Sequence, residues 1–227
     1  AEADGSMMER DRLAASPPVG FAEGGFTEIG PANAPIIYGK AGAILHMVRC
    51  FIGNERFSAG VQRFLEAKSF KSATTDEFLA LFGEGAGGEI ADVLERWIRT
   101  PGFPVVSVTR NSSTLELTQS RFLLGDKKDT AKRPIPLTVQ FLDVDGSFST
   151  KSLLFDGSEM SLEAPEHAAF KINAEQAGLY RVAYDKTSFA NLTDTYSQWG
   201  VSDRTGIISD YNARHFQGTV SLEEVHE

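Results

Sequence analysis

The sequence predicts an α+β fold in which a helical lobe precedes a small antiparallel β-sandwich and helices resume after the sandwich. Apolar residues recur with helical spacing from Ile37 to about Arg99. Beyond Pro104 the period becomes two, in about seven short runs that are typical of a sandwich. After Tyr184 the spacing becomes helical again. These two changes of period indicate segregated helical and β parts.

Successive helices are expected in the helical lobe. The first two are separated by Gly53, which is a helix stop signal. A third begins at Thr74, where the side chains of Thr74 and Glu77 can satisfy two free backbone N–H groups reciprocally. The last helix is the most regular, because the apolar residues from Ile90 to Ile98 all lie on one helical face. Pro101 then ends the lobe.

Short strands with turn signals between them are expected after the lobe. Apolar residues alternate at Val106 and Val108, Leu115 and Leu117, and Ile135 to Phe141. Further strand-like runs are Ser152 to Phe155, Ala169 to Ile172 and Leu179 to Tyr184. Asp145-Gly146 is a hairpin turn signal. The helices expected after Tyr184 have no obvious surface to pack against, so the chain is expected to be part of something larger.

Four segments follow from this pattern. Residues 1–33 are rich in Gly, Pro and Ala and are expected to be irregular. Residues 34–101 form the helical lobe, residues 102–185 form the sandwich, and residues 186–227 begin a further helical domain.

Composition excludes several kinds of partner. The net charge is −9, with 31 acidic against 22 basic residues, so no nucleic acid partner is expected. No stretch approaches the roughly 20 apolar residues that cross a bilayer, and no membrane span is expected. The single cysteine, Cys50, lies in a helical pattern without a paired histidine and is expected in the core. The compartment stays open, because Asn111 and Asn191 lie in glycosylation sequons that count only in a secreted protein.

Three motifs have simpler explanations than binding. The glycine-rich run 83–88 matches a dinucleotide loop by letter but follows a helix, so a flexible turn between helices is expected. The run 143–146 resembles the start of a calcium loop but lacks its later ligands, so a hairpin turn is expected. No histidine pair has helical zinc-site spacing, and no metal-binding or cofactor-binding residue is expected among these surface or packed residues: His46, His167, His215 and His226.

Tyr38 is the remaining candidate for chemistry. A tyrosine at a helix start beside Pro35 is structural more often than catalytic when it is considered alone. Its neighbours change this interpretation. The run from Ile36 to Met47 resembles the tyrosine-containing helix of the zinc aminopeptidases of the aminopeptidase N type, where Tyr38 and Lys40 match the family's Tyr-x-Lys-Gly and Ala41 departs from it.

Further runs resemble the same family in the family's order. They are the Gly53–Phe57 step, the helix start at 73–78, the tryptophan and Gly-Phe-Pro signature at 97–105, the strands at 117–122 and 135–137, and the run 173–185 that leads into a C-terminal helical domain. The resemblance implies a thermolysin-like catalytic domain that ends near Pro101, and zinc in the full-length parent. It also implies that Tyr38 donates a hydrogen bond to the oxyanion at the scissile carbonyl. The family's Gly-x-Met-Glu-Asn and His-Glu-x-x-His motifs are not in this sequence.

Three functions stay open at this point. The first is a segment of a zinc aminopeptidase that acts on peptide substrates and has the rest of the same polypeptide as its partner. Such a segment, without the zinc motif, would bind no metal and be inactive alone. The second is a non-catalytic scaffold or binding module related to the family. The third is an unrelated module, which predicts that Tyr38 is buried away from any cleft.

Overall fold

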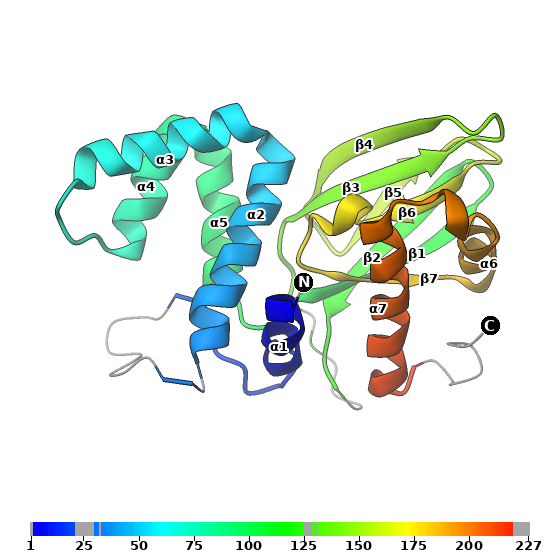
Figure 1. Cartoon of the computed structure of the whole chain (residues 1–227), viewed down its shortest axis with the longest axis horizontal. Helices are drawn as coiled ribbons and strands as arrows, with labels where there is room; N and C mark the ends of the chain where they lie inside the picture. Colours follow the sequence, from blue (N-terminus) through cyan, green and yellow to red (C-terminus); the bar gives the residue numbers. More distant parts are fainter. Residues whose placement is uncertain (1, 21–29, 32, 125–128, 130, 220–227) are drawn as a thin grey trace.

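The computed structural model describes residues 2–20, 30–31, 33–124, 129 and 131–219, and Figure 1 shows a helical lobe beside a β-sandwich. The α+β fold class is confirmed. The helical elements of the lobe are α1 (Glu2–Asp11), the π-helical turn η1 (Pro35–Lys40), α2 (Ala41–Ile52), α3 (Asn54–Lys68), α4 (Thr75–Ala86) and α5 (Gly88–Arg99).

Two sheets form the sandwich. Their strands are β1 (Pro104–Asn111), β2 (Thr114–Arg121), β3 (Ile135–Leu142), β4 (Phe148–Phe155), β5 (Glu159–Glu163), β6 (Ala169–Ile172) and β7 (Arg181–Tyr184). One sheet has the order β5-β2-β1-β7 and the other has the order β4-β3-β6. All neighbouring strands are antiparallel except β1 and β7, which pair in parallel. The core between the sheets is apolar because alternate residues of β1 and β3 point inward.

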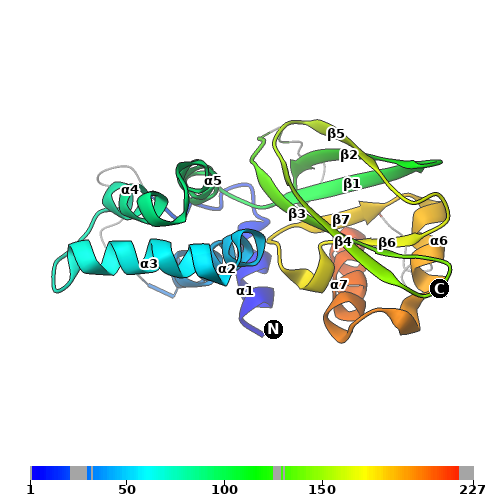
Figure 2. The same cartoon turned by 90° about the horizontal axis from the view of Figure 1, so that it is seen from above.

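Further helical elements come after β6 and β7 and pack against one side of the sandwich. These are η2 (Ala174–Gln176), α6 (Lys186–Asp194), η3 (Tyr196–Gln198) and α7 (Val201–Gln217). Figure 2 shows α6 and α7 on the same side of the sandwich. Within the described part of the chain, no helix is long and apolar enough to cross a membrane.

The expectation that residues 1–33 are irregular is wrong for the first of them, because Glu2–Asp11 form α1. In both views α1 lies where the helical lobe meets the sandwich (Figures 1 and 2). Its side chain at Met7 is buried, with 1% exposed. A single buried apolar residue makes no helical period, so the sequence pattern could not reveal this helix.

The glycine-rich run 83–88 is mostly helix rather than a flexible turn. α4 continues to Ala86, and the chain breaks only at Gly87, whose φ of 113° favours glycine. Gly85 serves close packing instead, because a Cβ there would lie 2.5 Å from the carbonyl oxygen of Ala59 in α3. The hairpin expected at Asp145-Gly146 is confirmed, since Gly146 N donates to Asp143 O at 2.9 Å.

Candidate functional site

Tyr38 lies in η1, the π-helical turn that leads directly into α2. Its side chain is 66% exposed, which contradicts the reading of an unrelated module with a buried tyrosine. Its backbone is fixed, because Tyr38 O accepts a hydrogen bond from Ala41 N at the start of α2. Single π-helical turns are rare and occur frequently at functional sites. The phenol is therefore presented to solvent from an ordered turn.

Three neighbours of Tyr38 anchor this turn from its inner side. Ile36 is 1% exposed and Lys40 is fully buried. Gly39 approaches α1 so closely that a Cβ would lie 3.2 Å from Met7 Cβ. Turn η1 thus packs on helix α1, while the side chain of Tyr38 is exposed to solvent.

Lys40 reaches into the boundary between the lobe and the sandwich. Its ammonium has three N–H donors. Three oxygen atoms lie within 3.1 Å of Lys40 Nζ, namely Gly102 O at 2.8 Å, Asp11 Oδ2 at 3.0 Å and Thr100 O at 3.1 Å. Asp11 is also fully buried, and its Oδ1 accepts hydrogen bonds from Gly102 N at 3.0 Å and Ser16 Oγ at 2.6 Å.

Arg133, which precedes β3, completes this group from the sandwich side. It donates from Nη1 to Gly102 O at 2.6 Å and from Nη2 to Pro101 O at 3.0 Å. Its guanidinium lies 4.9 Å from the ring centroid of Trp97 in α5. We call Asp11, Lys40, Arg133 and the backbone of 100–102 the junction cluster.

The electrostatics of the junction cluster follow from its burial. Burial lowers the pKa of Lys40 to about 8, although the carboxylate of Asp11 acts in the opposite direction. Burial also lowers the pKa of Arg133 to about 10. Arg121 is a further cation nearby, and its Nη2 donates to Leu13 O at 3.1 Å. The positive charges therefore depend for their stabilisation on Asp11, on Asp129, which lies 3.0 Å from Arg121 Nη1, and on backbone carbonyls.

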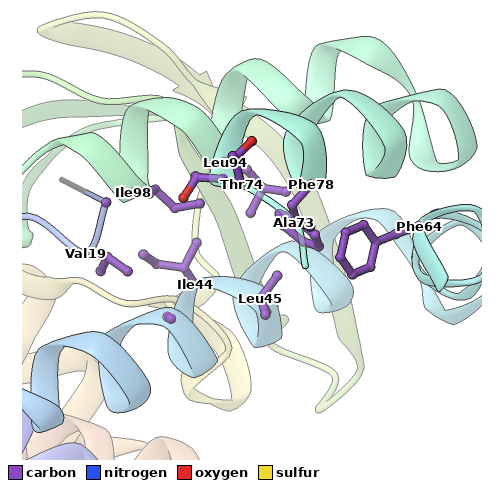
Figure 3. A pocket seen from close by; sticks show the side chains of 12 residues that line it. Val19, Ile44, Leu45, Phe64, Ala73, Thr74, Phe78, Leu94 and Ile98 are labelled. Atoms are coloured by element: carbon purple, nitrogen blue, oxygen red, sulfur yellow. The ribbon is translucent and has the colours of Figure 1, made fainter. Parts of the chain in front are cut away.

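A separate apolar cavity of about 300 Å³ is lined mainly by residues of α2, α4 and α5 (Figure 3). Ile44 and Leu45 of α2 and Leu94 and Ile98 of α5 point into it, as Figure 3 shows. Ala41, three residues after Tyr38, also lines this cavity, but Tyr38 does not. The cavity can accept an apolar side chain, and the described residues that line it include no group that could carry out acid–base chemistry.

The expectation that Cys50 is a core residue is wrong. Its side chain is exposed, and its Sγ lies 3.6 Å from His46 Nε2 one helical turn earlier. His167 is also exposed, His215 is half-buried, and His226 lies outside the described residues. Burial raises the pKa of the Cys50 thiol, so the pair has no activated thiolate.

A zinc ion does not fit the residues that the structure describes. Catalytic zinc requires three protein ligands and structural zinc requires four. No group of three His, Cys, Asp or Glu side chains that could hold a metal occurs within the described ranges, and His46 with Cys50 supplies only two. Tyr38 and the zinc implied by the family resemblance are therefore not brought together by the described residues of this chain.

Sequence reasoning singled out Tyr38 but missed the residues that hold its turn. Asp11 fell in a segment expected to be irregular, and Arg133 lies in a connection between strands. One signal was present: Lys40 interrupts the apolar face of a helix, and a buried lysine needs a carboxylate partner. The identity of that partner depends on tertiary structure.

Comparisons with known proteins agree with the family resemblance. The model of the peptidase family M1 domain matches residues 2–97. Tricorn protease-interacting factor F2 of Thermoplasma acidophilum is 31% identical over 220 residues, which cover 97% of this chain and 27% of the relative. The alanine/arginine aminopeptidase of Saccharomyces cerevisiae is 28% identical over 218 residues, which cover 94% of this chain and 25% of the relative. The leucyl aminopeptidase of Saccharolobus solfataricus is 29% identical over 217 residues, which cover 96% of this chain and 27% of the relative.

These alignments extend over the lobe, the sandwich and the helices that follow. The chain spans only about a quarter of the length of these curated relatives. The family match over residues 2–97, the relatives and the ordered motifs support one assignment, a fragment of a peptidase of the M1 family, of the aminopeptidase N type.

Proposed function

We propose that this chain is part of a zinc-dependent aminopeptidase that removes N-terminal residues from peptides, and that Tyr38 is a catalytic residue of that enzyme. The observation that carries the proposal is the exposed phenol of Tyr38 on an ordered π-helical turn, at the position where the family resemblance expects the catalytic tyrosine. Several relatives are named aminopeptidases, which supports the same activity for the full-length protein.

The role proposed for Tyr38 is electrostatic. When the carbonyl carbon of the scissile bond is attacked, its oxygen gains negative charge. The hydroxyl of Tyr38 donates a hydrogen bond to that oxygen, and a fixed donor stabilises the transition state without having to reorganise. Ile36, Gly39 and Lys40 hold the backbone of the turn, so the position from which the phenol extends is set before the substrate binds.

The proposal includes a division of the chain. Residues 34–101 are the end of the catalytic domain, residues 102–185 are the sandwich domain, and residues 186–227 begin a C-terminal helical domain. The zinc ligands and the general base are supplied by parts of the enzyme outside this sequence. The isolated chain therefore binds no catalytic zinc and has no peptidase activity. Stoichiometric zinc together with hydrolysis of an aminoacyl-coumarin by the purified chain would contradict this.

Replacing Tyr38 by Phe in the full-length protein tests the catalytic role. Removing one oxyanion donor lowers kcat by roughly 100- to 1000-fold, with little change in KM, because the hydrogen bond strengthens in the transition state. Tyr196→Phe is the matched control, since it removes a phenol hydroxyl whose nearest partner is Arg204 O in the C-terminal helices. Steady-state kinetics on an aminoacyl-coumarin measure kcat and KM for both variants. A rise in KM with unchanged kcat would refute the role.

A non-catalytic scaffold related to the family is the alternative. It predicts that the full-length protein has no turnover even with zinc present, and that Tyr38→Phe changes nothing. Assay of the unsubstituted full-length protein separates the two functions.

A further inference from the structure

The junction cluster is not explained by the proposed role of Tyr38 alone. Asp11, Lys40 and Arg133 have no exposed surface, with 0% relative exposure each. Burying charges costs free energy, and a buried ion pair is often no more stabilising than a well-packed apolar pair. Three charged side chains in one fully buried site are therefore weak evidence for stability and invite a positional explanation.

The cluster converges on one peptide segment. The carbonyl of Gly102 accepts from both Lys40 Nζ and Arg133 Nη1, and the amide of Gly102 donates to Asp11 Oδ1. Only glycine suits this position, because its φ is 75° and a Cβ would clash with Arg121. The segment thus holds α1, η1 and the sandwich in one arrangement through hydrogen bonds of defined direction.

Lys40 connects this hydrogen-bonded segment to the turn that carries Tyr38. It is the last residue of η1, two positions after Tyr38, and its backbone leads into α2. No side chain caps η1 or the start of α2. The side chain of Lys40 consequently links the turn to the backbone of 100–102 through hydrogen bonds. Arg133 binds the same backbone segment from the sandwich side.

We propose that Lys40, Asp11 and Arg133 are positioning residues for Tyr38, so that the sandwich domain, through Arg133 and Gly102, helps to set the direction of the catalytic hydroxyl. This inference rests on the proposed function of Tyr38. It assigns to the sandwich a contribution to turnover in addition to its contribution to folding. Displacing a catalytic group by about 1 Å can cost about 100-fold in rate, so even a small relaxation of the turn is measurable.

The test uses the full-length protein with Lys40→Met and Arg133→Met, which keep an unbranched apolar stem and remove the charge. Each is expected to lower kcat by roughly 10- to 100-fold while KM changes by less than about threefold. The matched control is Lys171→Met. Lys171 is also fully buried and lies 3.8 Å from Asp203, but it belongs to the sandwich and its C-terminal helices and has no partner in η1. The control is expected to lower the melting temperature and to leave kcat unchanged.

A second readout does not depend on turnover. Protein labelled with 3-fluorotyrosine gives a ¹⁹F resonance for Tyr38, identified as the one absent from Tyr38→Phe. This resonance is expected to shift or broaden in Lys40→Met and Arg133→Met and to stay in place in Lys171→Met. Lys40→Arg retains a cation at the same position and is expected to recover part of the lost kcat.

The outcomes separate the inference from the function beneath it. If Tyr38→Phe loses turnover but Lys40→Met and Arg133→Met keep normal kcat and an unchanged Tyr38 resonance, the positioning role is overturned and the proposed function stands. If Tyr38→Phe keeps full turnover, both are overturned. Should Lys40→Met fail to fold, the double variant Asp11→Asn with Lys40→Met removes both buried charges together and answers the same question.

Discussion

Gly39 is the residue at which the turn that carries Tyr38 comes closest to α1. A Cβ at Gly39 would lie 3.2 Å from Met7 Cβ and 3.3 Å from Met7 Cγ. Because Met7 Cβ is attached directly to the α1 backbone, an added methyl group has to push the turn and the helix apart. Overpacking of this kind costs about 1 to 3 kcal/mol.

Gly39→Ala is therefore expected to lower the free energy of unfolding by about 1 kcal/mol. Gly42→Ala is the matched control in α2, because nothing lies within 4 Å of a Cβ there. Alanine favours a helix over glycine, so the control is expected to gain roughly 0.5 to 1 kcal/mol. Urea unfolding of both variants measures the contrast. If Gly39→Ala and Gly42→Ala raised the free energy of unfolding equally, Met7 would be able to move aside for the added methyl group without cost.

Helix α4 shows at the level of an element how a sequence signal becomes a hydrogen-bonded structure. Thr74 Oγ1 accepts from Glu77 N at 3.2 Å, and Thr74 N donates to Glu77 Oε2 at 2.9 Å, as the capping box requires. Thr74→Ala is expected to lower the free energy of unfolding by about 1 kcal/mol. Thr75→Ala, one residue into the helix, removes no capping bond and is expected to change it by less than about 0.5 kcal/mol. Thermal or urea unfolding measures the free energy of unfolding of both variants. Equal losses of that free energy in Thr74→Ala and Thr75→Ala would exclude a capping effect.

The individual helices and strands also show why most of the fold could be predicted. Elements α2, α4, α5, β1 and β3 each bury one face or most of their length, so their apolar periods are strong. Strand β5 was missed because it is short and has only two apolar residues, Met160 and Leu162, which are half-buried. The parallel pairing of β1 with β7 was missed as well, because a period of two says nothing about strand direction.

The candidate site was predictable only in part, for a different reason. Tyr38 could be singled out by its neighbours in sequence. Its support could not, because Asp11, Lys40 and Arg133 are distant in sequence and meet only after the lobe and the sandwich have packed together. Buried polar partners of this kind carry no periodic signal.

At the scale of the whole molecule, the junction cluster makes stability depend on pH in a specific window. Burial lowers the pKa of Lys40 to about 8 from its ordinary value of 10.5. Between these two values the unfolded chain binds more protons at this residue than the folded chain does. The free energy of unfolding contributed by Lys40 therefore rises with pH across the window, by at most about 1.4 kcal/mol per pH unit. Below about pH 8 the folded protein bears the full cost of burying the cation.

Comparison of the unsubstituted chain with Lys40→Met isolates this dependence. Lys171 also has a pKa lowered by burial, but it is present in both proteins and its contribution cancels in the difference. Free energies of unfolding measured in urea from pH 7.5 to 10 are expected to rise more steeply in the unsubstituted chain than in Lys40→Met. Parallel profiles would mean that Lys40 keeps its proton throughout this range. The ion pair with Asp11 would then outweigh burial, and the charge that tethers the Tyr38 turn would persist at every working pH.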